Sequence, residues 1–374
     1  MNKTIVKLLK KPVTATFVSV ILGFIVAAVI LAAAGYNPFE AFGALLWGTL
    51  GRPKYVANTL IKSTPIMITG LSIAFAYKMG LFNIGAEGQY IAGSIAATMV
   101  GILLDLPAVL EIPLIIGAGM LSGALYGGLA GLLKAKFGIN EVITTIMLNW
   151  IALYLCNFIS QITPFYKPGT TGTYPVNESG HTVLLAKWKT SEAAAEFIGR
   201  HPMIGDMMRT DFNIGIFAAV LLAVGISFFL YRTAKGYELR AVGCNKDAAE
   251  FAGISVKKNI VHTMLIAGGL AGLAAALNIT GINPHNISHL AMFEQNGMNG
   301  IAVAFIAGGS PLGCIFSGLL FGGLLYGGQS IQYEIGAPSE IINIMIGTIV
   351  FFVALTKILP SLAEYLAKRG GNRG

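Results

Sequence analysis

The chain alternates long apolar runs with short polar segments, and this pattern predicts membrane-spanning helices. A helix needs about 20 apolar residues to cross the hydrocarbon core. Ten runs approach that length: 14–34, 58–77, 84–104, 110–133, 142–162, 213–231, 259–280, 296–309, 311–332 and 338–358. The eighth run is short and interrupted by glycines, which indicates a broken or re-entrant segment near 296–313. We therefore expect an all-α polytopic membrane protein in which residues 1–374 form one transmembrane domain.

Composition and charge support a membrane protein over a soluble one. The chain is 55% hydrophobic and only 11% charged, whereas soluble domains carry about 25% charged residues. A net charge of +8 raises the question of nucleic acid. The basic residues, however, lie in short segments between apolar runs, as the positive-inside rule predicts for membrane proteins. With the N-terminus inside, 17 of the 25 Lys and Arg fall on the cytoplasmic side. We expect a multi-pass cell-membrane protein with both termini cytoplasmic and no nucleic-acid partner.

The sequence lacks the signatures of catalysis and metal binding. Cys156, Cys244 and Cys314 are far apart, and no Cys/His cluster occurs. His285 and His289 are four residues apart, but the Gly, Pro and Asn residues around them favour a loop over a metal site. The chain has no GxxxxGK[ST] phosphate-binding loop and no Ser/His/Asp arrangement. We expect no catalytic residue, no metal and no cofactor bound by this chain.

The segment NIGAEGQY (residues 83–90) places a carboxylate and two amides at the start of an apolar run. Ionisable residues inside membranes are costly and mark functional sites by default. Asn83, Glu87 and Gln89 are therefore candidates for a solute path or gate. Alternatively, Glu87 caps helix ends or pairs with Lys78, and the sequence leaves both interpretations open.

A second polar cluster lies in GINEVITTIMLNW (residues 138–150). Asn140 and Glu141 begin the predicted helix. Thr145 and Asn149 are four residues apart, so they share one helix face. Such uncharged polar groups either join helices or bind a polar, uncharged solute, and both roles remain possible.

Glycines recur at four-residue intervals in the fourth apolar run, at Gly119, Gly123, Gly127 and Gly131. Small residues at this spacing allow helix backbones to approach closely. We predict that these glycines serve helix packing.

Two connections are longer than a simple turn requires. Residues 163–212 form an outer polar loop that either covers the outer mouth or meets a partner, or is a lineage-specific insertion. Residues 232–258 lie inside, and their Ala-rich centre predicts a short helix. Asn245 would cap that helix, Asp247 would lie in its first turn, and Gly253 would end it.

The cytoplasmic segment GYELRAVGCNKDAAEFAGI (236–254) resembles the coupling loop of ABC importer permeases in the branched-chain amino acid and simple sugar superfamily. GLFNIGAEGQYIAGSIAA (80–97), NEVITTIMLNW (140–150) and NGIAVAFIAGGSPLG (299–313) resemble the subgroup of nucleoside (guanosine-type) and simple-sugar permeases. The resemblance covers residues from about 55 to 360. Cys244 departs from the family, which often has glutamate or another polar residue there.

The resemblance implies a role for each matching segment. The helix that couples the permease to its ATPase would comprise Arg240, Gly243, Asn245, Asp247, Ala248, Ala249, Phe251, Gly253 and Ile254. Apart from the resemblance, the polar residues of these segments make up a candidate translocation path, which comprises Asn83, Glu87, Gln89, Asn140, Glu141, Thr145, Asn149, Asn299 and Phe305. The implied partners are an ABC ATPase subunit that binds ATP and Mg²⁺, a second permease that is a paralogue, an extracellular substrate-binding lipoprotein, and membrane lipid.

The expected function is a permease subunit that is not itself an enzyme and that imports nucleosides by alternating access. The same machine could instead carry ribose or another simple sugar. A different class is an ion-coupled secondary transporter with Glu87 or Glu141 as its proton site, and a membrane scaffold or channel is a third possibility. The predicted docking helix discriminates, since an ion-coupled carrier needs none.

Overall fold

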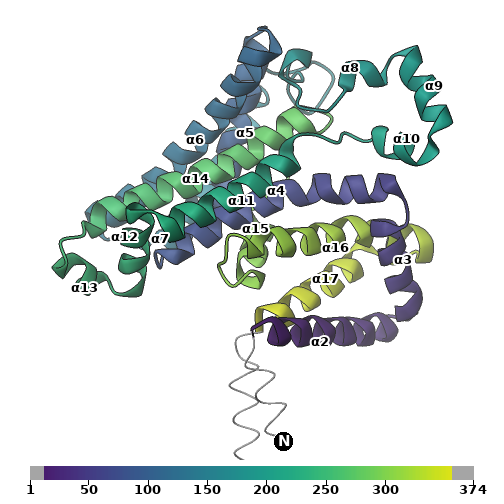
Figure 1. Ribbon diagram of the computed structural model, residues 1–374. Coiled ribbons are helices and arrows are strands. Elements are labelled where there is room, and N and C mark those ends of the chain that lie inside the picture. Colours follow the sequence, from purple (N-terminus) through teal and green to yellow (C-terminus); the bar gives the residue numbers. More distant parts are fainter. Residues whose placement is uncertain (1–11, 356–374) are drawn as a thin grey trace, which may run out of the picture. The chain divides into compact units, whose positions relative to one another are not determined.

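Helices make up the regular structure of residues 12–355, the part of the chain that the computed structural model describes. Within that range the structure holds only isolated β-bridges and no β-strand. Each of the ten predicted runs overlaps one helix. These helices are α2 (Pro12–Ala33), α4 (Pro53–Lys78), α5 (Ala86–Leu103), α6 (Ala108–Phe137), α7 (Glu141–Ile159), α11 (Gly215–Arg232), α14 (Val256–Gly281), α15 (Asn296–Ile306), α16 (Gly313–Ile335) and α17 (Ser339–Ala354). The all-helical class is confirmed for these residues (Figure 1).

Six of the described helices are long and apolar enough to cross a membrane, namely α4, α6, α7, α11, α14 and α16. Shorter apolar helices cover Phe17–Ala33, Asn296–Ile306 and Ser339–Phe352. A multi-pass membrane protein is thus supported, while the count of ten spans stays a prediction. The terminal basic residues, including Lys3 and Arg373, lie outside the described residues, as does the end of the run 338–358.

Several helices were not predicted: α3 (Pro38–Leu50), the 3₁₀ helix η1 (Glu178–Gly180), α8 (Ala186–Lys189), α9 (Glu192–Arg200), α10 (Pro202–Met208) and α12 (Ala234–Cys244). The signal for α3 was present in the sequence. Asn37 accepts a hydrogen bond from the Phe39 N–H, Pro38 opens the helix, and Glu40 lies in the first turn. With 13 residues, α3 is shorter than the length used to find spans.

The chain divides into two compact units. Unit 1 comprises Met1–Gly51 with Gly323–Gly374, and unit 2 comprises Arg52–Gly322. Each is described by itself, and the single transmembrane domain stays a prediction. In unit 1, α2 packs along α17, where a Cβ on Gly23 would lie 2.9 Å from the Ile349 Cα. This close approach requires a residue without a side chain.

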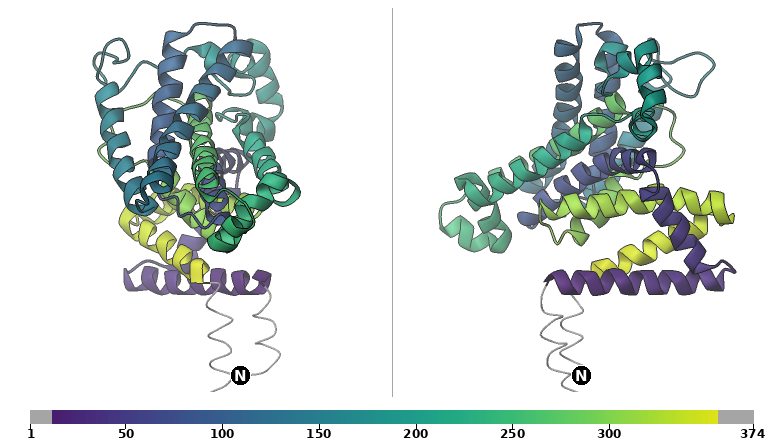
Figure 2. Two further views of the ribbon diagram at one scale, coloured as in Figure 1. Left: turned by 90° about the vertical axis from the view of Figure 1, so that its left-hand side faces the viewer. Right: turned by 45° about the vertical axis from the view of Figure 1, so that its right-hand side comes forward.

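The predicted glycine stripe of α6 faces α14 in unit 2, where the two helices run side by side (Figure 2). A Cβ on Gly123 would lie 2.4 Å from the Gly268 carbonyl oxygen, and one on Gly127 would lie 2.5 Å from the Met264 carbonyl oxygen. Gly119 and Gly131 also face α14. A side chain at these positions would separate the two backbones.

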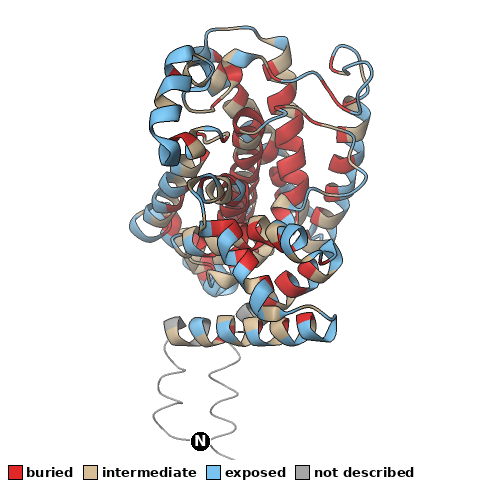
Figure 3. Cartoon of the chain, turned by 90° about the vertical axis from the view of Figure 1, so that its right-hand side faces the viewer, coloured by how far each residue is buried: buried red, intermediate tan, exposed pale blue. Residues whose placement is uncertain are grey.

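The core of unit 2 lies along α4 and α14, whose residues are largely buried (Figure 3). Met67, Leu71 and Phe75 of α4 and Met264 and Leu270 of α14 belong to one buried cluster. Burial of such side chains stabilises each by about 1.5–3 kcal/mol in water. In a membrane, close packing and hydrogen bonds take over much of that role.

The long polar segment 163–212 packs against residues 282–290, which follow α14. Gly172 forms a β-bridge with Ser288, and the Val176 N–H donates to the His285 carbonyl at 2.8 Å. His285 stacks on His181 with ring centroids 3.8 Å apart. Residues 282–295 contain no helix, so the predicted loop around His285 and His289 is confirmed.

Candidate functional site

The segment between α4 and α5 places a pair of amides inside the protein. Gly80 has a left-handed backbone (φ 75°), and α5 begins at Ala86. Asn83 and Gln89 are both buried and donate to each other, with Nδ2 to Oε1 at 2.9 Å and Nε2 to Oδ1 at 3.0 Å. The Asn83 Oδ1 atom also accepts from the Gly85 N–H at 3.1 Å. These bonds fix the turn that leads into α5.

Glu87, in the first turn of α5, caps the N-terminus of α15. Its Oε1 atom accepts from the Gln295 N–H at 2.9 Å, and its Oε2 atom accepts from the N–H groups of Gly297 at 2.6 Å and Met298 at 3.1 Å. The side chain is fully buried. A carboxylate at a helix N-terminus satisfies free N–H groups and complements the helix dipole. Glu87 therefore joins the starts of two helices.

Four further residues, Asn296, Tyr90, Glu294 and Thr69, hold this junction together. The Asn296 amide donates to the Tyr90 hydroxyl at 3.1 Å and to the Glu294 carboxylate at 3.2 Å. The Thr69 hydroxyl of α4 donates to the Asn296 carbonyl at 2.8 Å. No sequence pattern predicted a role for these residues. The available signal was the polar run Glu294, Gln295 and Asn296 in FEQNGMNG (residues 293–300), which precedes an apolar stretch.

The middle of α7 binds the same junction. The Asn149 side chain accepts from the Gly88 N–H at 2.8 Å and donates to the Ile84 carbonyl at 3.1 Å. A Cβ on Gly85 would lie 2.8 Å from the Thr145 Cβ. Asn83, Glu87, Gln89, Thr145 and Asn149 therefore lie together, which the sequence pattern alone did not establish. We call this group, with Tyr90 and Asn296, the polar junction.

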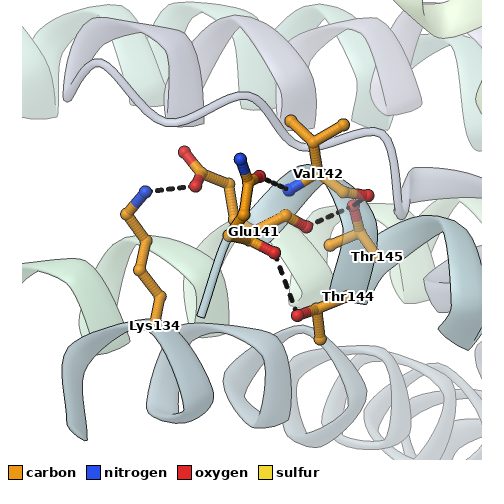
Figure 4. Close-up of polar contacts among 6 residues, drawn as sticks. Lys134, Glu141, Val142, Thr144 and Thr145 are labelled. Carbon is orange, nitrogen blue, oxygen red and sulfur yellow. Dashed lines mark hydrogen bonds and ion pairs between the residues drawn. The ribbon is translucent and has the colours of Figure 1, made fainter. Parts of the chain in front are cut away.

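Asn140 caps α7 and Glu141 is its first residue, and Figure 4 shows Glu141 with its partner Lys134. The Asn140 side chain accepts from the Val142 N–H at 2.8 Å and caps the helix. Glu141 pairs with Lys134 of α6. The Thr145 hydroxyl donates to the Glu141 carbonyl at 2.7 Å. These contacts tie the end of α6 to the start of α7.

Aromatic and polar side chains beside the polar junction remain open to their surroundings. Trp150 and Tyr154 of α7 are exposed, and the Trp150 ring lies 4.8 Å from the Phe293 ring. Glu294, next to Phe293, is exposed as well. We call Trp150, Tyr154, Phe293 and Glu294 the open aromatic face. In a membrane, an exposed carboxylate requires water or a partner.

Along α15, Asn299 is half-buried and Phe305 is 38% exposed. The Phe305 ring packs 5.9 Å from Tyr77 and 5.7 Å from Phe82. The predicted path residues on α15 therefore differ from those of the polar junction, because their side chains are only partly covered.

The predicted short helix is present as α13 (Lys246–Phe251), with the predicted ends. The Asn245 side chain accepts from the Ala248 N–H at 3.0 Å, and Asp247 lies in the first turn. Gly253 has a left-handed backbone (φ 82°), and the Ile254 N–H donates to the Ala249 carbonyl at 3.0 Å. The capping chemistry read from the sequence is confirmed.

One side of α13 is covered and the other is open. Ala249 is buried, whereas Phe251 is 98% exposed. Arg240 of α12 donates from Nε to the Leu230 carbonyl at 2.9 Å, and its guanidinium lies 5.1 Å from the centre of the Tyr231 ring. These two contacts tie α12 to the end of α11.

Gly243, in the last turn of α12, packs directly against the end of α4. A Cβ there would lie 2.2 Å from the Lys78 carbonyl oxygen. Lys78 precedes the segment that carries Asn83 and Glu87. The α12–α13 pair and the polar junction are therefore linked by one short stretch of chain.

Near α13, the carboxylate of Glu238 interacts with two neighbouring side chains. Lys235 donates to Glu238 at 2.6 Å and Asn259 donates to the same oxygen at 3.3 Å. The hydrogen bond from Lys235, followed by that from Asn259, lowers the pKa of Glu238. Glu238 therefore keeps its negative charge in a region rich in Lys and Arg.

The chain is similar to known transport proteins over most of its length. Residues 55–354 match the family described as branched-chain amino acid transport system / permease component. The guanosine ABC transporter permease protein NupP of Bacillus subtilis is 37% identical over 95% of this chain and 97% of that protein. The nucleoside ABC transporter permease protein NupB of Lactococcus lactis is 35% identical over 93% of this chain and 92% of that protein. The glucose ABC transporter permease protein TsgB13 of Haloferax volcanii is 28% identical over 95% and 90%.

A second permease from each of the first two organisms also matches, at lower identity. NupQ of Bacillus subtilis is 26% identical over 59% of this chain and 66% of that protein. NupC of Lactococcus lactis is 28% identical over 71% of this chain and 78% of that protein. No solved structure matches the chain.

Proposed function

Because the chain belongs to the branched-chain amino acid transport system / permease component family, we propose that it is the transmembrane permease subunit of an ATP-driven ABC importer for nucleosides. The observation that carries the substrate class is the 37% identity to a guanosine permease over 95% of the chain. A nucleoside permease of similar identity and coverage supports the same class. The chain supplies the path, and ATP hydrolysis belongs to a separate subunit.

In this proposal the solute moves along the open aromatic face, beside the polar junction. A nucleoside is uncharged and polar and carries a flat base. Trp150 and Phe293 offer ring faces on which a base stacks, and Glu294 offers acceptors to ribose hydroxyls. Stacking on an aromatic side chain contributes about 1–3 kcal/mol per base. Asn299 and Phe305 extend the same path along α15.

We propose a structural role for Glu87 beside the path in place of direct contact with the solute. Both of its oxygens already accept backbone hydrogen bonds, and its side chain is fully buried. We propose that Glu87 sets the shape of the path by holding α5 to α15, while neighbouring side chains meet the solute. This arrangement also weighs against Glu87 as the proton site of an ion-coupled carrier.

We also propose that α15 is a broken segment, a half-helix that belongs to one of about ten membrane spans. Its first turn contacts Thr69, nine residues before the end of α4. Gly309, just after α15, lies beside Tyr77 at the end of α4, where a Cβ would be 3.0 Å from that ring. An α15 that starts about 13 Å inside the end of α4, at 1.5 Å per residue, matches a half-helix lining a cavity.

The α13 helix is proposed to dock on the ATPase subunit, which binds ATP and Mg²⁺. Movement of α13 would reach the polar junction through Gly243, the end of α4 and the segment that carries Asn83. Phe251 is the side chain best placed to enter a groove on the ATPase, because it is exposed and large. Both termini are placed in the cytoplasm, on the same side as α13.

The partners proposed are a second permease, an ATPase subunit and an extracellular substrate-binding lipoprotein. Two organisms each hold a pair of differing permeases similar to this chain, which supports a paralogue as the second permease. The outer segment 163–212 is the proposed contact for the lipoprotein.

Uptake of labelled guanosine tests this function. Cells with and without the gene are compared, and excess unlabelled ribose is the competitor. Loss of guanosine uptake on deletion, with ribose having no effect in cells that carry the gene, would support the proposal. Restoration by wild type but not by Trp150→Ala would place the path at the open aromatic face, with Phe316→Ala, an exposed aromatic of α16, as the matched control.

A simple sugar is the second candidate substrate, favoured by the 28% identity to a glucose permease. Loss of sugar uptake with unchanged guanosine uptake would keep the importer and replace its substrate. If deletion changes neither guanosine uptake nor sugar uptake, both candidate substrates are wrong.

A further inference from the structure

A groove of about 650 Å³ lies between the end of α6 and the start of α14 in unit 2. Its walls include Leu132 and Ala135 of α6 and Val261 of α14. Its rim carries Lys136 of α6 and Lys257 and Lys258 of α14, and the lining contains no carboxylate. We call this the basic groove. It is separate from the polar junction and from α13.

Two of the rim lysines lie where the dipole of their helix disfavours positive charge. Lys257 and Lys258 fall in the first turn of α14, which contains no acidic residue. Positive charges at a helix N-terminus oppose the helix dipole. Among the residues that the structure describes, neither lysine nor Lys136 forms an ion pair. Three cations without a carboxylate partner among the described residues therefore attract an anion from outside the chain.

Nearby acidic groups do not neutralise this rim. Glu238 lies near His262, which also lines the groove, but its carboxylate is held by Lys235 and Asn259. Glu141 is paired with Lys134. The groove thus combines three exposed lysines with an apolar lining.

The apolar part of the groove continues into an exposed stripe along α6. Leu121, Leu125, Leu129 and Leu132 are all exposed and follow one another at intervals of three or four residues. Residues at this spacing share one face of a helix. An occupant with an anionic head and a long apolar tail fits both parts of the surface, whereas a soluble protein fits only the charged rim.

We propose that the basic groove binds an acidic phospholipid. The headgroup phosphate lies between Lys136, Lys257 and Lys258, and the acyl chains follow Leu132 along the stripe of α6. Basic residues at a membrane surface each attract anionic lipid by about 1 kcal/mol, roughly fivefold in binding. The bound lipid would fill the groove beside the first turns of α14, which follows α13 directly. The proposal does not depend on which solute is transported.

Native mass spectrometry of the purified full-length chain tests the proposal, after washing in detergent and titration with phosphatidylglycerol or phosphatidylcholine. We expect one tightly held phosphatidylglycerol per chain and at least roughly tenfold weaker retention of phosphatidylcholine. The double variant Lys257→Gln/Lys258→Gln should hold phosphatidylglycerol roughly tenfold or more weakly. Lys167→Gln/Lys187→Gln removes the same charge from two exposed lysines of the outer segment and should have no effect.

A second variant separates lipid from other anions. Ala135→Trp fills the groove without changing its charge, and it should also weaken retention of phosphatidylglycerol. Equal binding of both lipids, or unchanged binding in Lys257→Gln/Lys258→Gln, would overturn the proposal. A site for free phosphate is the answer if millimolar inorganic phosphate displaces the lipid while Ala135→Trp has no effect. Loss of the co-purified ATPase with unchanged lipid binding would identify the rim as a protein contact instead.

Discussion

At the scale of single residues, Glu87 is the side chain whose removal should disturb the fold most directly. Glu87→Ala leaves the N–H groups of Gln295, Gly297 and Met298 without their acceptor, and that of Gly297 is buried. A buried polar group without a partner costs about 1–3 kcal/mol. We expect a clearly lower melting temperature of the purified chain in detergent. Glu87→Gln, which keeps one oxygen acceptor, should fall between wild type and Glu87→Ala.

Glu294→Gln provides the matched control for Glu87. Among the described residues, its carboxylate accepts a hydrogen bond from Asn296 only, and its side chain is exposed. The melting temperature of Glu294→Gln should stay close to that of wild type. Equal melting of Glu87→Ala and Glu294→Gln would show that the cap on α15 does not stabilise the protein.

His285 should make the outer segment sensitive to acid. Burial, and then the nearby His181, lower the pKa of His285, although its hydrogen bond to the Ile279 carbonyl and the charge of Asp211 oppose this. An unfolded histidine has a pKa of about 6.5. Between the lowered folded pKa and that value the unfolded state binds more protons, so stability falls as pH drops. The effect levels off below the folded pKa.

Melting temperatures at several pH values between about 7 and 5 test this expectation. The wild-type chain should lose stability on acidification, and His285→Asn should lose less. His201→Asn, at an exposed histidine between α9 and α10, serves as the control and should keep the wild-type slope. A wild-type chain that gains stability on acidification would contradict the argument.

The chemistry of these residues was readable from the sequence, but their partners were not. A carboxylate between two glycines predicted either a path residue or a helix cap, and both depend on local composition. The groups that Glu87 caps lie more than 200 residues later in the chain. No local pattern encodes such a pairing. The contact between Tyr90 and Asn296 was not predicted for the same reason.

At the scale of elements, the glycine stripe of α6 sets the distance to α14. Gly123→Ala would place a Cβ 2.4 Å from the Gly268 carbonyl oxygen, so the helices must separate. Overpacking of a well-packed core typically costs about 1–3 kcal/mol. We expect a lower melting temperature and weaker transport.

Gly117→Ala, on the same helix, is the matched control for Gly123→Ala. No atom lies within 4 Å of a Cβ at Gly117. Alanine also favours helix over glycine by up to about 1 kcal/mol. The melting temperature should therefore stay the same or rise. A similar loss in both variants would indicate that helix packing is not the reason for the stripe.

The long apolar helices were predictable because membrane helices follow a simple rule of length and hydropathy. Helix α13 was predictable as well, since Asn245 and Gly253 carry local capping signals. In contrast, α3 and the short helices of the segment 163–212 are too short for that rule. Their stability depends on contacts with distant segments, such as the β-bridge of Gly172 with Ser288.

At the scale of the whole molecule, the transport class was predictable because several motifs of one family recur along the chain. The arrangement of the buried polar side chains was not predictable. Asn83, Glu87, Thr145 and Asn149 were grouped as candidate path residues, and each of them is buried with hydrogen-bond partners inside the protein. The side chains left open beside them, Trp150 among them, follow from the fold and not from any motif.

Assembly of the importer should depend on Phe251 at the exposed end of α13. A side chain that is 98% exposed contributes little to the folded chain, so Phe251→Ala should leave the melting temperature unchanged. Buried aromatic anchors at interfaces often contribute 2 kcal/mol or more, roughly thirtyfold in affinity. We therefore expect the variant to lose most of the co-purified ATPase subunit and most guanosine uptake.

Phe39→Ala controls for the loss of an exposed aromatic side chain, because Phe39 is 87% exposed but lies on α3 in unit 1. It should retain both the ATPase subunit and uptake. If Phe251→Ala retains all of the ATPase subunit, α13 is not the docking element. Unchanged nucleoside uptake would agree with that outcome. The proposed coupling from α13 through Gly243 to the polar junction would then be wrong. The proposal that the chain is a permease would not be affected.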